Sequence, residues 1–178
     1  YDFSKTAADA FIIGRRILQN AEEAQELTAD ADAALQAQIE VASLAWETCI
    51  AATVIHYIND VIADMGDMAP PSYGSLDNFT NLTKHWGEMK GFALGLQFSP
   101  VSPFRTAETI GGIDGTEALR RVLSLMGDAP VLADGSQGGV APSGTAAEAL
   151  AAYEAKLLEA RDLMQEAYAL NPDAVSIW

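Results

Sequence analysis

The longest periodic segment of the chain, from about Ala33 to Met65, most constrains its fold. One stripe recurs along it at alternating steps of four and three residues: Leu44, Thr48, Ala51, Ile55, Ile58, Ile62 and Met65. This spacing places the stripe on one face of a helix. Several β-branched residues in the segment weaken helix propensity only slightly, so the three-and-four spacing still predicts a helix. A helix of this length with one apolar stripe is typical of a helical bundle.

Three other segments complete the predicted bundle. Residues 82–96 and 116–126 show helical spacing, and the last helix begins at a capping box formed by Thr145 and Glu148. Near the N-terminus, Thr6 and Asp9 have the spacing of a capping pair, and Ala7, Phe11, Gly14 and Leu18 share one face. Prolines and glycines predict a break between residues 65 and 74 and a helix end at Ser99.

The predicted fold class is therefore all-α. We expect an up-and-down helical bundle, with short helices and long ordered loops between residues 97 and 145, where glycine and proline are frequent. No strand pattern is visible. Because 49% of the 178 residues are hydrophobic, the chain can bury a sizeable core. We expect residues 1–178 to form a single helical domain.

The charge of the chain excludes some functions. Asp and Glu number 25 against 10 Lys and Arg, which gives a net charge of -15. Such a surface repels phosphate backbones and anionic lipids, so we expect no nucleic-acid partner. No apolar run reaches the roughly 20 residues that span a bilayer, so we expect no transmembrane segment in this chain. Cys49 is the only cysteine, which excludes an internal disulfide and a multi-thiolate zinc site.

The chain begins at Tyr1 rather than at a methionine. We therefore expect either that a targeting segment has been removed or that the chain is part of a longer protein. Both are consistent with a secreted or envelope protein.

The densest chemistry lies between Leu82 and Leu96. His85 falls within the apolar stripe of this predicted helix, and Glu88 follows it by three residues, so the two side chains project beside each other. Gly87, Gly91 and Gly95 recur every four residues and predict a notch where another helix or a ligand approaches the backbone closely.

The pair of His85 and Glu88 predicts a metal or small-ligand site. A histidine and a glutamate three residues apart on a helix can present a nitrogen and an oxygen to one divalent ion, such as iron or zinc. Two ligands hold a metal weakly, and His56 is the natural third ligand because it is the only other histidine. A further candidate pocket comprises Glu47, Asn59, Asp60, Trp86 and Gly91. The structural alternative is that both histidines are hydrogen-bonded core residues.

Hydrolysis is a weaker alternative. His85 and Glu88 could act as base and acid or position a metal-bound water. The zincin pattern of two histidines around a glutamate is absent, and no Gly-x-Ser-x-Gly turn occurs. The residues therefore leave open whether the protein is an enzyme.

Several motifs resemble a known family. They are Trp46-Glu47, the run from Thr53 to Asp60, the run His85-Trp86-Gly87-Glu88-Met89-Lys90-Gly91-Phe92-Ala93-Leu94-Gly95-Leu96-Gln97-Phe98, and Gly127 to Leu132. Together they resemble uncharacterised, often lipid-anchored bacterial envelope proteins that are similar to the imelysin-like group. That group has a His-x-x-Glu signature, matched here by His85 and Glu88. The resemblance implies a periplasmic or cell-surface location, a metal-linked role connected with iron uptake, and a link to a metallopeptidase.

A scaffold function is the main alternative. The glycine notch, Trp46, Trp86 and the acidic surface also suit a non-catalytic domain that docks a partner. That partner would be the N-terminal part of the same precursor or another envelope protein. The docking hypothesis predicts an exposed apolar face and dimerisation without a metal. The metal hypothesis predicts that His56, His85 and Glu88 converge within a few ångströms.

Overall fold

The structure is a computed structural model that describes residues 2–67 and 75–178. Its main helices are α1 (Phe3–Ala24), α2 (Ala29–Asp67), α3 (Leu76–Gly95), α5 (Gly115–Met126) and α6 (Ala146–Ala167). Two short helices, α4 (Pro103–Thr106) and α7 (Pro172–Val175), and a two-stranded antiparallel sheet of β1 (Thr109–Ile110) and β2 (Ile113–Asp114) complete it. The all-α prediction is confirmed.

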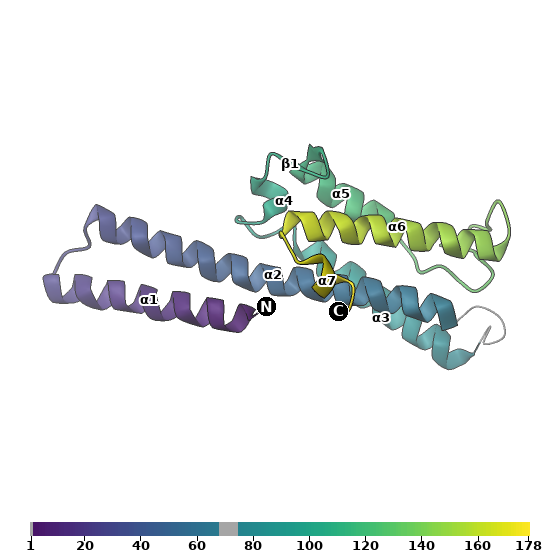
Figure 1. The fold of residues 1–178 in the computed structure, drawn as a ribbon, viewed down its shortest axis with the longest axis horizontal. Helices are drawn as coiled ribbons and strands as arrows, with labels where there is room; N and C mark the ends of the chain where they lie inside the picture. Colours follow the sequence, from purple (N-terminus) through teal and green to yellow (C-terminus); the bar gives the residue numbers. More distant parts are fainter. Residues whose placement is uncertain (1, 68–74) are drawn as a thin grey trace.

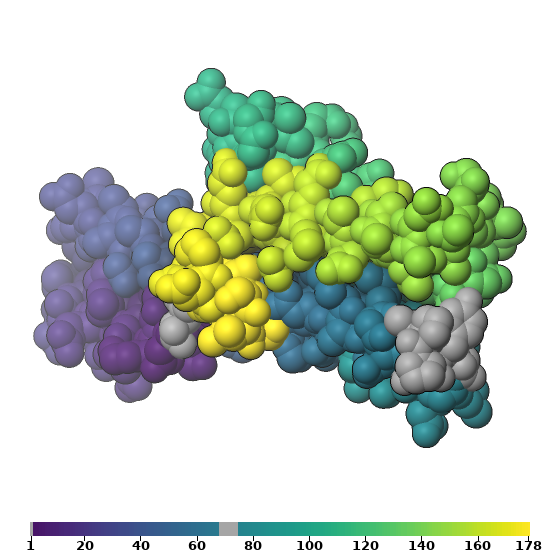
Figure 2. Space-filling model, turned by 45° about the vertical axis from the view of Figure 1, so that its right-hand side comes forward, coloured from purple at the N-terminus to yellow at the C-terminus, as the bar shows by residue number. Residues whose placement is uncertain are grey.

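The long helix α2 belongs to two parts of the molecule (Figure 1). Its N-terminal half pairs with α1 in an antiparallel hairpin that projects from the rest of the fold. Its C-terminal half packs against α3 and α6 in the helical bundle, which α5 completes by packing on α6 and α3. We call α1 together with residues 25–46 the arm. In the space-filling view the arm extends to one side, and α6 and α7 cover the bundle (Figure 2).

The core lies in the bundle. Residues of α2 with helical spacing, such as Val54, Ile58 and Val61, are fully buried there. They belong to one cluster with buried residues of the other bundle helices, among them Leu82, Met89, Val122, Leu157 and Met164. By length and composition alone, α2 is also apolar enough to cross a membrane. The core helix of a folded bundle can have the same length and composition.

The connections between residues 97 and 145 are short helices and ordered loops, as predicted. Asp114 caps α5 by accepting from the backbone N–H groups of Thr116 and Glu117. The small β1–β2 hairpin precedes it and was not expected. The predicted capping box of Thr145 and Glu148 is present at the start of α6.

Two helix boundaries differ from the predictions. Helix α1 begins at Phe3, where the Asp2 carboxylate accepts from the N–H of Lys5, so Thr6 is not its cap. Helix α3 ends at Gly95 rather than at Ser99. The predicted break begins after Asp67, and residues 68–74 lie outside the described residues.

The residues predicted to share one face of the first helix differ in burial. Ala7 and Gly14 are buried against α2, but Phe11 and Leu18 are 71% and 50% exposed. Leu44, at the start of the predicted α2 stripe, is exposed as well. The stripe does not become part of the core until α2 enters the bundle, because in the arm only α1 is available to cover it.

Candidate functional site

His85 lies between α3 and α2, paired with a carboxylate that the sequence prediction did not include. Its Nδ1 is 2.7 Å from Oδ2 of Asp64, and the two side chains are only 20% and 14% exposed. Low exposure limits solvent screening of this contact. The pair therefore links α2 and α3 by one polar contact at the edge of their apolar interface.

Tyr57 connects His85 with Glu88. Its ring stacks on the His85 ring with centroids 5.9 Å apart and on the Phe92 ring at 6.0 Å. Burial raises the pKa of the Tyr57 hydroxyl, and the neighbouring Glu88 carboxylate raises it further. The Oε2 atom of Glu88 is buried and has no hydrogen-bond partner among the described residues. A buried carboxylate oxygen is usually satisfied by a donor.

His56 does not join this cluster as a third ligand. Its Nε2 lies 3.2 Å from Oδ2 of Asp60, one turn further along α2, and its side chain is 50% exposed. The His56 ring also lines a shallow hollow of about 320 Å³ beside Phe3 and Trp178, near both chain ends. Each histidine thus has its own carboxylate partner.

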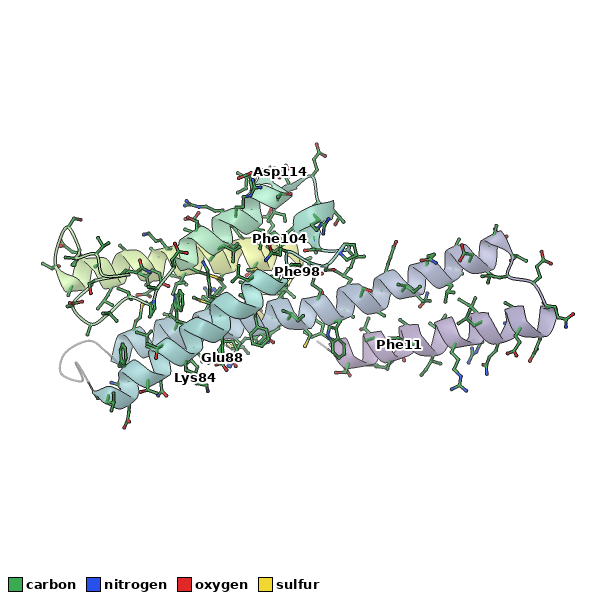
Figure 3. All side chains as sticks on the ribbon, turned by 180° about the vertical axis from the view of Figure 1, so that it is seen from behind. Phe11, Lys84, Glu88, Phe98, Phe104 and Asp114 are labelled. Carbon is green, nitrogen blue, oxygen red and sulfur yellow. The ribbon has the colours of Figure 1, made fainter. Side chains whose placement is uncertain are left out.

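The donor atoms do not fit a metal site built from three protein side chains. Across residues 2–67 and 75–178, no three His, Cys, Asp or Glu side chains gather closely enough to hold a metal ion. The predicted convergence of His56, His85 and Glu88 is therefore not seen. Instead, His85, Tyr57 and Glu88 form a cluster of aromatic and polar side chains between α2 and α3, on the side where Figure 3 labels Glu88.

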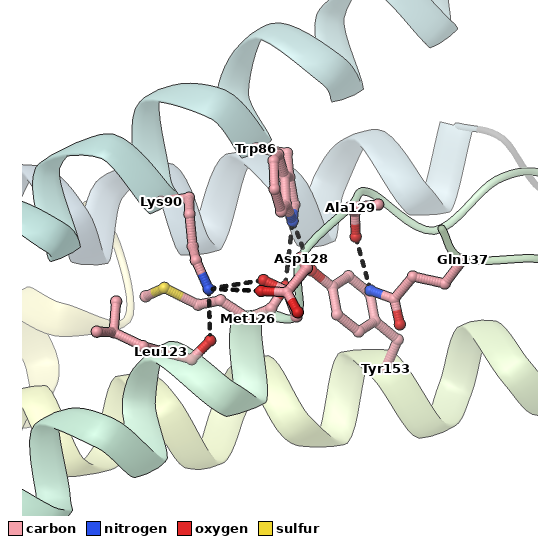
Figure 4. A network of polar contacts seen from close by, with 9 residues as sticks. Trp86, Lys90, Leu123, Met126, Asp128, Ala129, Gln137 and Tyr153 are labelled. Carbon is pink, nitrogen blue, oxygen red and sulfur yellow. Dashed lines mark hydrogen bonds and ion pairs between the residues drawn. The ribbon is translucent and has the colours of Figure 1, made fainter. Parts of the chain in front are cut away.

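The opposite side of α3 carries a second polar network (Figure 4). The indole N–H of Trp86 donates to the Met126 carbonyl at 3.1 Å and to the Tyr153 hydroxyl at 3.0 Å. Tyr153 itself donates to the Met126 carbonyl at 2.6 Å. The Lys90 ammonium donates to the carbonyls of Leu123 and Gly127, both at 2.7 Å.

This network caps the C-terminus of α5. The last carbonyls of a helix have no partners within the helix and lie at the negative end of its dipole. Lys90 and Trp86, one turn apart on α3, satisfy those carbonyls from the side. Burial lowers the pKa of Lys90, and Asp128, at 3.8 Å, partly opposes that effect. Trp86 and Lys90, two residues of the distinctive motif that begins at His85, therefore have a structural role.

The remaining pocket candidates lie elsewhere. Glu47 is 4% exposed, and its Oε1 accepts from the Tyr168 hydroxyl at 2.6 Å, while its Oε2 is buried without a partner among the described residues. The Asn59 amide donates to the carbonyls of Val175 and Trp178, and Arg161 donates to its oxygen. Both α2 residues hold the C-terminal part of the chain in place rather than joining Glu88.

The predicted glycine notch holds no other helix of this chain among the described residues. A Cβ atom added to Gly87, Gly91 or Gly95 would meet no atom within 4 Å among the described residues. All three glycines lie on the outer side of α3, which is exposed. Their four-residue spacing therefore does not mark a helix contact within this chain.

The arm exposes more large apolar side chains than its own packing needs. Its inner seam consists mainly of small residues: Ala7, Ala10, Gly14, Ala31, Ala42 and Ala45. At Gly14 the facing helix lies in contact, since an added Cβ would be 3.4 Å from the Leu35 side chain. Small residues permit this approach but bury little apolar surface.

Large side chains lie on both sides of that seam. Phe11, Leu18 and Trp46 each follow a seam residue by four positions, and Ile39 follows Leu35, which packs beside Gly14, by the same interval; we call these four residues flank one. Ile13, Val41 and Leu44 each precede a seam residue by one position and form flank two. Because α1 and α2 run antiparallel, the same rotation from the seam leads to the same side of the hairpin in both helices.

Flank one contains the two most exposed aromatic side chains of the arm, Phe11 at 71% and Trp46 at 69%. Phe11 lies on the arm, clear of the bundle (Figure 3). Sequence reasoning placed Phe11 and Leu18 on one face with Ala7 and Gly14, which are buried. The signal that could have corrected it is the run Phe11-Ile12-Ile13, which is apolar on all sides of one turn and cannot be covered by a single partner helix.

Comparison with known proteins gives no match to a family model, a curated protein or a solved structure. The imelysin-like resemblance therefore stays a prediction from the motifs themselves.

Proposed function

We propose that this protein is an assembly domain that docks onto another helical surface through its arm. The observation that supports the proposal is the set of large apolar side chains on flank one. Contiguous exposed apolar patches of more than a few hundred Å² on a folded protein are typical of interaction sites. Trp and Phe, the aromatic members of flank one, are also enriched in the cores of protein interfaces.

The construction of the arm supports the same conclusion. A hairpin of two helices with an Ala and Gly seam buries too little apolar surface to be stable by itself, because most helical stability comes from the packing of apolar faces. In the bundle, by contrast, α2 is covered by α3 and α6. A docked partner would cover the arm in the way that α3 and α6 cover the C-terminal half of α2.

The shape of the apolar surface of the arm favours a helical partner. Two roughly parallel ridges of apolar side chains on a helical hairpin fit the grooves of another helix pair. The N-terminal part of the same precursor and another envelope protein both remain proposed partners of this kind. The location in the bacterial envelope rests on the sequence resemblance.

A photo-crosslinking amino acid at position 11 tests the proposal. The matched control is the same amino acid at Phe98, which is 76% exposed but lies just beyond the end of α3, outside the arm. We expect intermolecular adducts from position 11 under native conditions and few from position 98. Equal yields at the two positions would show that the arm is not a specific docking surface.

A second candidate function is the binding of a small ligand or cation at Glu88. The buried Oε2 atom without a partner favours it, because such an atom requires a donor or a cation. Iron or zinc binding, the link to iron uptake and a peptidase-like activity remain proposals from the resemblance.

Metal titration of the purified protein tests this candidate. The design compares the wild type with His85→Ala and Glu88→Ala, and with His56→Ala as a third variant, under added iron or zinc. Stoichiometric binding that is lost in the His85 and Glu88 variants alone would support a site at this cluster. Binding that is unchanged in all three variants would exclude it.

A further inference from the structure

We propose that the partner of flank one is the same flank on a second copy of this chain, so that two arms form an antiparallel four-helix bundle. This inference rests on the proposed docking function and names the occupant. The contact surface is flank one, which comprises Phe11, Leu18, Ile39 and Trp46.

The exposed area of flank one matches what a stable dimer needs. Leu18 and Ile39 are both 50% exposed, and the two aromatic residues are about 70% exposed. With side-chain areas of roughly 180–250 Å², the four residues present roughly 500 Å² of apolar surface. A standard interface buries about 800 Å² per partner, of which about 60% is apolar. The four side chains therefore supply about the whole apolar share of one half of such an interface.

The shape of the arm suits a symmetric contact. Each helix of the arm contributes two flank-one residues that are seven positions apart, Phe11 with Leu18 and Ile39 with Trp46. Side chains seven positions apart lie on one line along a helix and can insert between those of a facing helix. A two-fold contact uses one patch twice, so a single self-complementary flank is sufficient.

Charge determines how the two arms are oriented. The tip of the arm carries Glu22, Glu23, Glu26, Asp30 and Asp32, and residues 17–83 contain no Lys or Arg. The cations of the arm, Lys5, Arg15 and Arg16, lie toward its base and middle. A dimer with both tips at one end would place two acidic clusters together. The antiparallel arrangement separates the tips and brings each one closer to the part of the other arm that carries its cations.

The net charge of -15 per chain adds a property that can be measured. Two such chains repel each other at low ionic strength, and added salt screens that repulsion. An apolar interface between them is not weakened by moderate salt. We therefore expect self-association to strengthen as salt is raised toward about 0.15 M, where the Debye length is about 8 Å.

Light scattering coupled to size-exclusion chromatography tests the dimer with the whole purified chain. We expect the wild type to have twice the chain mass at concentrations well above about 1 μM. The variant Phe11→Glu with Trp46→Glu should be monomeric, since losing one interface hot spot already weakens binding roughly thirtyfold. The matched control, Ile13→Glu with Leu44→Glu on flank two, should remain dimeric. Circular dichroism checks that both variants keep their helix content.

The outcomes separate this inference from the docking proposal. A wild type that is monomeric at every salt concentration, or a dimer that the flank-two variant disrupts equally, overturns the second copy as the occupant. If that protein still forms arm-specific adducts from position 11 with a different protein, docking stands and the homodimer is wrong. If neither self-association nor arm-specific adducts are found, both proposals fail.

Discussion

Replacing Lys90 by methionine should destabilise the fold more than any other single lysine substitution in α3. The ammonium donates to the Leu123 and Gly127 carbonyls at 2.7 Å, and the side chain is 15% exposed. Hydrogen bonds that involve a charged group contribute about 1.5–3 kcal/mol each, but methionine relieves the desolvation of the buried ammonium and keeps the apolar stem. We expect a net loss of about 2–3 kcal/mol in the free energy of unfolding.

Urea unfolding monitored by circular dichroism measures this loss directly. For a chain of this size the melting temperature should fall by roughly 4–12 °C. Lys84→Met is the matched control, because Lys84 lies on the same helix but is exposed, and its substitution should change stability by less than about 0.5 kcal/mol. Equal stabilities of the two variants would refute the role of Lys90 as the side-on cap of α5.

Three further predictions concern other polar and backbone features. Burial raises the pKa of Tyr153 above its usual 10.0, so above pH 10 the hydroxyl ionises in the unfolded chain but stays protonated in the folded one, and the fold loses about 1.4 kcal/mol per pH unit. Urea unfolding at pH 9 and 11 should show a smaller loss for Tyr153→Phe than for the wild type. Equal losses would contradict this. Thr145→Ala removes the capping box and should cost about 1 kcal/mol in urea unfolding, whereas Thr145→Ser should cost little. Gly135→Ala should cost at least about 1–3 kcal/mol by thermal melting, because φ is +82° and the new Cβ would lie 2.9 Å from Ala149; an unchanged melting temperature would show that the loop adapts.

Helices could be predicted where local pattern and final packing agree. The alternating spacing in α2 and the capping box at Thr145 are properties of neighbouring residues, and both are present in the structure. The first cap was misplaced for a related reason. Asp2 and Thr6 both have side chains suited to capping, and the choice between them depends on where the chain enters the arm.

The site could be predicted only in part, because spacing along one helix does not determine what faces it. His85 and Glu88 lie side by side on α3, as expected, but their partners are Asp64 and Tyr57 on α2. These pairings depend on how the two helices are rotated against each other. The sequence alone also could not show that Trp86 caps a helix some 40 positions away.

The arm shows a different limit. An apolar residue such as Phe11 satisfies the helical pattern whether its partner lies in this chain or in another one. Periodicity indicates that a face requires cover, and it carries no information about which molecule provides it. The glycines at 87, 91 and 95 show the converse, since their regular spacing has no packing partner among the described residues.

The continuity of α2 makes the arm a rigid extension with a fixed rotational phase. From the buried Glu47 to Ala29 the helix runs about 27 Å without interruption, at 1.5 Å per residue. Inserting one residue just before Glu47 would turn the N-terminal part of α2 by about 100° relative to the bundle, whereas inserting seven would nearly restore the phase while lengthening the extension by about 10 Å. The number of residues along α2 thus sets the direction in which flank one faces relative to the bundle.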